Sequence, residues 1–149
     1  MSLKIKNAIA VAVIVAALLA AFSTIGIAAS NARTIRITAN GQVLTARLVD
    51  SATTRDFVSL LPLDLILEDF GDAEKIAHLP RRLSTEGAPQ AIDPVAGDVT
   101  YYAPWGNLAI FVRDFRHSPG LVRLGAIESG FENLKVRGLV NARIERVDN

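Results

Sequence analysis

The stretch that decides the fold is YYAPWGNLAIFVRDFRHSPGLVRLGAIESG, residues Tyr101–Gly130. It contains both tyrosines, the single tryptophan, two of the six phenylalanines and one of the two histidines. Two strand-like runs, Asn107–Val112 and Leu121–Ile127, flank a turn sequence at His117–Gly120. The pattern predicts a β-rich fold and gives little indication of a binding or catalytic activity.

A hairpin is the most secure local prediction upstream of this stretch. Residues in Thr34–Ala39 and in Gln42–Leu48 alternate between apolar and polar side chains, as half-buried strands do. Between them lies Asn40-Gly41, and both residues tolerate the positive φ of a type I′ turn. Strands with one polar face are typical of antiparallel sheets.

A short helix and a second pair of strands are expected next. Either Asp50 or Ser51 can cap a helix over about Thr53–Leu61, which Pro62 ends. Apolar alternation then predicts a strand at Leu63–Phe70, and Glu74–Leu79 can pair with it.

The remaining elements complete a barrel pattern. Residues 81–97 hold two prolines and two glycines with little periodicity, which indicates a long surface loop, and such loops are often functional. Further strands are expected at Val99–Ala103, Asn107–Val112, Leu121–Ile127 and Ala142–Val147, with a helical turn or two at Gly130–Val136. We therefore predict a mainly β fold, a closed or nearly closed antiparallel barrel with about two short helices.

Composition excludes several classes of protein. The chain of 149 residues fits one domain. Without Lys4 and Lys6 it holds 14 basic and 15 acidic residues, which argues against nucleic acid as a partner. The absence of cysteine excludes disulfides, a thiol nucleophile and a cysteine zinc site. We predict no metal and no cofactor, since the two histidines are far apart and the acidic residues match no known metal loop; those acidic residues are Asp64, Glu68, Asp69, Asp72 and Glu74.

The first 29 residues have the parts of an export signal. Lys4 and Lys6 precede an uncharged apolar run that ends in small residues, and cleavage can follow Ala28, Ala29 or Ala32. The alternative is an uncleaved anchor, because the 22 residues of 8–29 are long enough to cross a bilayer. Both interpretations place the domain at 33–149 outside the cytoplasm, either periplasmic or secreted.

In the order of these elements and in its sequence motifs, the chain resembles small bacterial cyclophilin-like proteins of unknown function. The resemblance is carried by EKIAHLPRRLST at 74–85, GDVTYYAPWGNLAIFVRDF at 97–115 and GLVRLGAIESG at 120–130. It extends over about Thr34–Val147 and implies the cyclophilin-like barrel.

The catalytic residues of cyclophilin enzymes do not carry over by this resemblance. Those enzymes use an arginine and a glutamine on a strand pair, and the corresponding segment here, Leu65–Leu79, contains neither. The phenylalanine floor of their groove falls at or beside Ile110, and their histidine position falls on about Leu121. An apolar groove is expected without the groups that do the chemistry, so no catalytic residue is assigned.

The residues expected to bind a ligand are five. We expect Tyr102, Ile110 and Leu121 to line the groove, with Trp105 and Arg82 at its rim. Tyr101 and Tyr102 point to opposite faces of their strand, so one belongs to the core. For Trp105, a barrel plug is the favoured interpretation and stacking on a ligand the alternative.

Three functions remain open at this point. The leading hypothesis is an exported domain that binds an extended peptide or a small ligand. The second is a weak peptidyl-prolyl isomerase of the cell envelope. Isomerisation must overcome a barrier of about 20 kcal/mol, so such an enzyme needs a hydrogen-bond donor. Arg81 or Arg82 would replace the missing donor in this hypothesis. The third is a non-catalytic module that pairs with another envelope protein. The oligomeric state is left open.

Overall fold

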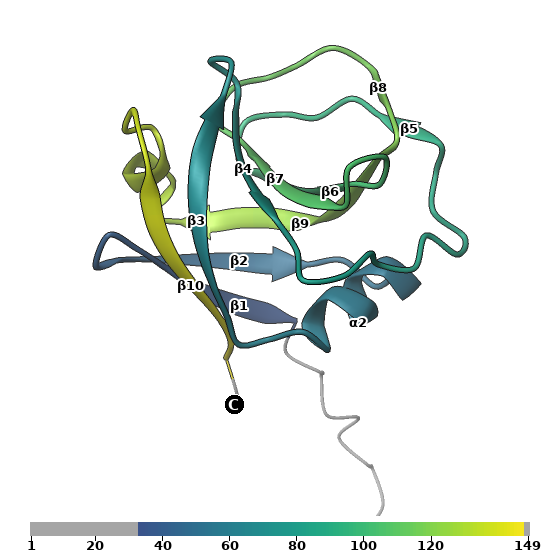
Figure 1. Ribbon diagram of the computed structural model, residues 1–149, viewed down its shortest axis with the longest axis horizontal. Coiled ribbons are helices and arrows are strands. Elements are labelled where there is room, and N and C mark those ends of the chain that lie inside the picture. Colours follow the sequence, from purple (N-terminus) through teal and green to yellow (C-terminus); the bar gives the residue numbers. More distant parts are fainter. Residues whose placement is uncertain (1–32, 148–149) are drawn as a thin grey trace, which may run out of the picture. The chain divides into compact units, whose positions relative to one another are not determined.

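The computed structural model describes residues 33–147. The predicted leader at 1–29 lies outside these residues. Within the described part, eight antiparallel strands close into a barrel (Figure 1). Their order around the barrel is β1 (Thr34–Ala39), β10 (Val140–Arg146), β3 (Leu63–Phe70), β4 (Glu74–His78), β7 (Asn107–Phe111), β6 (Asp98–Tyr102), β9 (Leu121–Ser129) and β2 (Gln42–Leu48). Between Arg33 and Val147, none of the helices is both long and apolar enough to cross a bilayer.

The predicted hairpin opens the barrel. Strands β1 (Thr34–Ala39) and β2 (Gln42–Leu48) pair antiparallel. The turn residues Asn40 and Gly41 have φ values of 47° and 80°, as the asparagine–glycine turn requires. Alternate side chains of both strands are buried in the barrel, so the polar-and-apolar pattern is satisfied on both.

A short helix closes one end of the barrel. Helix α2 spans Ala52–Val58, and the Ser51 hydroxyl accepts a hydrogen bond from the backbone N–H of Thr54 at its start. Ser51, rather than Asp50, is therefore the cap. Phe57 is fully buried and anchors the helix to the core. The helix is shorter than predicted, because the chain leaves helical geometry after Ser59 on its way to β3.

The remaining strands agree with the predicted ones to within a few residues. In chain order they are β3 (Leu63–Phe70), β4 (Glu74–His78), β6 (Asp98–Tyr102), β7 (Asn107–Phe111), β9 (Leu121–Ser129) and β10 (Val140–Arg146). The predicted helical turn near Gly130 is a short 3-10 helix, η2, at Phe131–Leu134. The fold is thus the closed antiparallel barrel that the sequence predicts.

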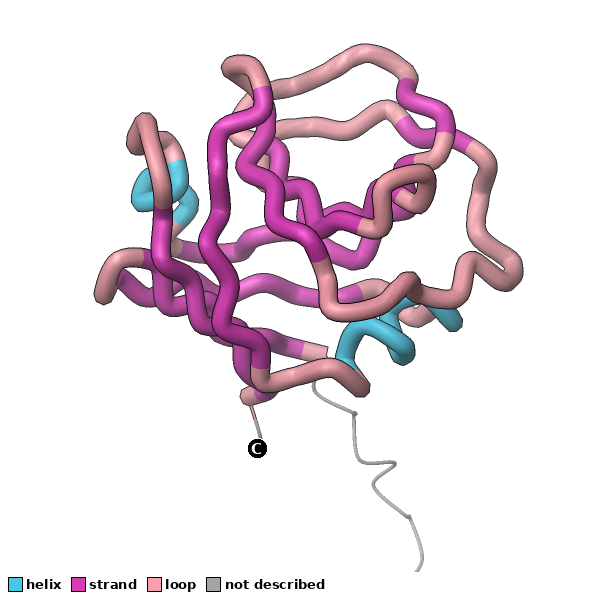
Figure 2. Tube along the Cα trace, in the orientation of Figure 1, coloured by secondary structure: helices cyan, strands magenta, loops and turns pink. Residues whose placement is uncertain are grey.

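A small ribbon outside the barrel was not predicted. Strand β5 (Ala91–Ile92) pairs with β8 (Ser118–Pro119), which ties the long 81–97 loop to the turn before β9 (Figure 2). The backbone N–H of Gly120 extends this link by donating to the carbonyl of Gln90 at 2.8 Å. Each partner is only two residues long, too short to show an alternation in sequence.

Two apolar clusters lie on the two faces of the barrel wall. The main core fills the interior, and its members on the wall strands include Leu108, Ile110 and Tyr101. The second cluster consists of Ile76, Ala109, Phe111 and Leu121, with Tyr102, Ile92 and Phe115 packed against it. Because neighbouring strand residues face opposite ways, this second cluster lies on the outer face of β4, β7, β6 and β9.

One lysine side chain, on strand β4, is buried in the protein. Lys75 is 1% exposed, and its ammonium lies 2.7 Å from the Asp69 carboxylate and donates to the carbonyl of Gly138 at 2.7 Å. The Lys75 ammonium holds the pKa of Asp69 below its usual range. A buried charge needs such partners, so this cluster joins β4 to the loop before β10.

Candidate functional site

A groove of about 300 Å³ lies on the outer face of the barrel, over the second apolar cluster. Strands β3, β4, β6 and β7 contribute one part of its lining, and the segment from Phe115 to Leu121 contributes the other. The lining residues are Phe70, Glu74, Ile76, Tyr102, Trp105, Asn107, Phe115, Arg116, His117, Ser118, Pro119 and Leu121.

Cross-strand register explains why these wall residues meet. Tyr102 lies opposite Asn107 on β7 and opposite Leu121 on β9. Residues opposite each other in an antiparallel pair share one face. The three side chains therefore converge on the outer face from three neighbouring strands.

Tyr101 and Tyr102 divide between the two faces as predicted. Tyr101 is 1% exposed in the main core, and its hydroxyl accepts a hydrogen bond from the backbone N–H of Leu83 at 3.1 Å. Tyr102 is partly buried and lines the groove.

Trp105 does not plug the barrel, which corrects the favoured sequence interpretation. Its side chain is 51% exposed and lies on the turn between β6 and β7. The indole makes edge-to-face contacts with the rings of Phe70 and Tyr102, with ring centroids 5.4 Å apart in both pairs. These aromatic contacts are favourable and hold the indole at the groove.

Ile110 does not line the groove, which corrects a second prediction. It is fully buried and packs in the main core with Leu108. The residues on either side of Ile110, Ala109 and Phe111, belong to the outer cluster instead. A shift of one residue along a strand reverses the face, so the resemblance identified the strand but not the side chain.

Arg82 holds the turn beside the groove and is absent from the lining. Its guanidinium donates from Nη1 to the carbonyl of Ala103 at 2.6 Å and from Nη2 to that of Pro104 at 3.1 Å. These two carbonyls belong to the turn that carries Trp105. Arg82 is therefore a positioning residue for the indole, whereas its predicted place was at the rim.

Arg81 is committed to a different contact. It forms a bidentate pair with Asp56, at 2.6 and 2.9 Å, that links the 81–97 loop to α2. The Arg81 guanidinium and the backbone N–H of Ser84 lower the pKa of Asp56 to about 2. Neither Arg81 nor Arg82 is thus free to act as a donor inside the groove.

Asn107 has an unpaired oxygen beneath the groove. The side chain is 1% exposed, and its Nδ2 donates to the carbonyl of Leu108 at 3.2 Å. Within residues 33–147 its buried Oδ1 has no hydrogen-bond partner. Leaving a buried acceptor without a partner has a free-energy cost, and this atom lies in the wall of the groove.

Several lining residues were missed by sequence reasoning. Phe70 is the last residue of β3 and faces outward with Glu68, and Phe115 lies beyond the end of β7. Arg116 lies over the Phe115 ring, with its guanidinium carbon 4.7 Å from the ring centroid, and His117 lies 3.2 Å from the Asp93 carboxylate. Phe115, Arg116 and His117 are loop residues and carry no periodic signal, so their position depends on the adjacent β5–β8 ribbon.

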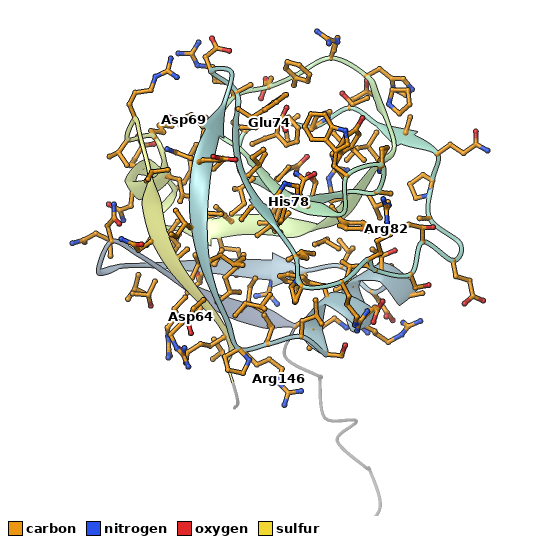
Figure 3. All side chains as sticks on the ribbon, viewed as in Figure 1. Asp64, Asp69, Glu74, His78, Arg82 and Arg146 are labelled. Atoms are coloured by element: carbon orange, nitrogen blue, oxygen red, sulfur yellow. The ribbon has the colours of Figure 1, made fainter. Side chains whose placement is uncertain are left out.

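Most of the acidic residues that the sequence groups together are spread over the surface. Asp64 and Asp69 lie toward opposite ends of β3, and Glu74 begins the next strand (Figure 3). Asp64 pairs with Arg143, and Asp72 pairs with Arg113. Among the described residues, no group of three or more acidic or histidine side chains has a metal-binding arrangement.

Comparison with known proteins agrees with this architecture. A model of the cyclophilin-like family matches residues 37–145. Among solved structures, the chain is similar to the hypothetical protein AF2241 from Archaeoglobus fulgidus, with a TM-score of 0.63 and 19% identity over 81% of this chain and 100% of that one. No curated protein sequence matches the chain significantly. With the family match extending over nearly the whole barrel, the chain belongs to the cyclophilin-like family.

Proposed function

We propose that this protein is an exported cyclophilin-like domain that binds an extended peptide or a small ligand in the outer-face groove. The observation that carries the proposal is the groove itself, about 300 Å³ of open space beside three aromatic rings and the unpaired Asn107 Oδ1. Apolar concave sites with a few polar groups are the usual form of ligand sites. Export is inferred from the leader sequence alone.

The groove suits binding better than catalysis. A prolyl isomerase needs an apolar pocket for proline and a donor aimed at the proline nitrogen. Segment Leu65–Leu79 supplies no arginine or glutamine, and Arg82 is engaged by two backbone carbonyls. Binding of a ligand without catalysis is therefore the function that this set of residues supports best.

A weak prolyl isomerase is the second candidate, and Arg116 is the observation that favours it. This arginine lines the groove and is held over the Phe115 ring. A guanidinium in that place can reach a ligand backbone from the loop side. The third hypothesis, a surface that only pairs with another envelope protein, is less favoured because Trp105 leaves the groove open.

Exchange NMR on the mature domain with a panel of X-Pro peptides tests the proposal. We expect saturable shifts at Tyr102, Trp105 and Leu121 without faster cis–trans exchange. Faster exchange that disappears in Arg116→Ala would establish the isomerase instead. Shifts confined to residues far from the groove, or no shifts with any peptide, would contradict the proposed site.

A further inference from the structure

Glu74 is the acidic side chain in the lining of the groove, and within residues 33–147 its carboxylate forms no ion pair. It begins β4, is half-buried and lines the groove beside Ile76. In the part of the chain that the structure describes, no cation lies close enough to pair with its carboxylate, and burial raises its pKa. By contrast, two nearby acidic residues are paired, Asp69 with Lys75 and Asp72 with Arg113. Glu74 therefore pays for desolvation without compensation inside the protein.

Aromatic rings surround the same space. Phe70 and Tyr102 meet the Trp105 indole edge-on, at interplanar angles of 86° and 78°. Rings at right angles to one another present faces in different directions. A cation within about 6 Å of such a face is attracted by the ring quadrupole, and tryptophan is the strongest of the three.

A second acceptor lies in the lining. The Asn107 amide is fixed by its Nδ2 bond to the Leu108 carbonyl, which leaves the acceptor end, Oδ1, without a partner among residues 33–147. Asn107 and Glu74 lie on the same outer face, on paired strands β7 and β4. Glu74 is thus the accessible acceptor of the groove, and the Asn107 Oδ1 lies buried in the wall beside it.

The positive groups of the lining are already engaged. The Arg116 guanidinium lies over the Phe115 ring at 4.7 Å, and His117 lies 3.2 Å from Asp93 on the ribbon. Both residues are exposed, so water also solvates them. Glu74 is half-buried, so water solvates its carboxylate less completely, and within residues 33–147 it forms no ion pair.

We infer that the groove selects a ligand with a protonated amine, which the Glu74 carboxylate pairs with and the Phe70, Tyr102 and Trp105 rings enclose. This inference rests on the proposed function, since it names the chemistry of the ligand for the same groove. The amine belongs either to a lysine side chain of a bound peptide or to a small free amine.

Paired probes test the inference by NMR titration and by Trp105 fluorescence. The peptide acetyl-Ala-Lys-Ala-amide carries the ammonium, and acetyl-Ala-norleucine-Ala-amide has a similar aliphatic stem without it. Butylamine represents the free amine. We expect the lysine peptide to bind about tenfold more tightly than the norleucine peptide at pH 7. Butylamine that binds as tightly as the lysine peptide would identify a small amine as the ligand class, and weaker binding would identify a peptide.

Matched variants assign the preference to Glu74. In Glu74→Gln the lysine-over-norleucine preference is expected to fall to about twofold or less, because the charge is lost and the shape is kept. In Glu86→Gln, which makes the same change at an exposed loop position outside the lining, the preference is expected to stay intact. A preference that survives in Glu74→Gln would overturn the inference.

Failure of the inference is distinguishable from failure of the proposed function. If the norleucine peptide or neutral X-Pro peptides bind the groove as well as the lysine peptide, the groove is a binding site and the selection for a cation is wrong. If none of these probes perturbs Trp105 or Leu121, the proposed function fails together with the inference.

Discussion

Tyr101 and Tyr102 are consecutive residues of β6 that lie on opposite faces of the barrel wall. The Tyr101 hydroxyl accepts the backbone N–H of Leu83 from inside the core, and the Tyr102 ring contacts Trp105 in the groove. One residue thus secures the 81–97 loop to the barrel, and the next lines the groove. Stability and binding can be separated by mutating two neighbours.

The tyrosine pair gives the first prediction. Tyr101→Phe leaves the Leu83 N–H without a partner in a buried place, so we expect it to lower the free energy of unfolding by about 1–2 kcal/mol. Tyr102→Phe removes a hydroxyl that does not satisfy a buried backbone N–H, and it is expected to change the free energy of unfolding by about 0.5 kcal/mol or less. Urea denaturation of both variants measures the difference. Equal stability of the two would contradict the role given to the Tyr101 hydroxyl.

Arg82 gives the second prediction. Arg82→Met removes both hydrogen bonds to the turn that carries Trp105, and we expect a several-fold loss of ligand affinity with a stability loss of about 1 kcal/mol. Greater mobility of the indole would lower its fluorescence anisotropy. Arg113→Met, which removes an exposed pair with Asp72, is the matched control and is expected to leave affinity unchanged. Unaltered affinity in Arg82→Met would show that the turn keeps its shape without the arginine.

Gly125 gives the third prediction, for the seam between β9 and β2. A Cβ at this position would collide with the carbonyl oxygen of Arg47 and lie 2.8 Å from the Cα of Leu48. Backbone atoms cannot move aside cheaply, so Gly125→Ala is expected to destabilise the fold by about 2–3 kcal/mol. Ala126→Ser adds one atom to the exposed neighbour and is expected to have little effect. Thermal unfolding of both variants tests this, and a stable Gly125→Ala protein would contradict the close approach.

Glu74 gives the fourth prediction, a dependence of stability on pH. Burial raises the pKa of Glu74 above its ordinary value of 4.5, so the folded state holds the proton more tightly than the unfolded state does. Stability contributed by protonation is therefore lost as the pH rises from about 4.5 through the raised pKa. Glu74→Gln is expected to be more stable than the natural protein at pH 7, and the gain is expected to vanish at acid pH.

Urea denaturation at pH 7 and pH 4 measures the gain from Glu74→Gln. Glu86→Gln provides the comparison, because Glu86 is exposed. A variant Glu74→Gln that is less stable than the natural protein at pH 7 would mean that the carboxylate has a stabilising partner.

Local patterns predicted much of the fold. The Asn40-Gly41 turn and the alternation on either side of it determine the first hairpin, because both signals depend on adjacent residues. The serine cap and the apolar anchor Phe57 likewise located α2. Barrel closure followed from the number and shortness of the strands.

Features that depend on distant residues were less accessible. Trp105 is held at the groove by Phe70, a residue 35 positions earlier in the chain, so its sequence neighbours gave no sign of the contact. The face of Ile110 depends on strand register, which the motif alone did not determine. The contributions of Arg116 and His117 depend on the β5–β8 ribbon, whose two-residue strands leave no pattern.

Trp105 is the single tryptophan of the chain, so its emission reports on the groove without interference from other indoles. The side chain is half-exposed in the free protein. The most direct test of the account is a fluorescence titration of the domain at residues 33–149 with the peptides that shift its NMR spectrum. We predict a saturable blue shift of Trp105 emission with the same affinity that NMR reports. Saturable binding seen by NMR while the Trp105 emission stays unchanged would contradict the account, because the ligand would then lie elsewhere.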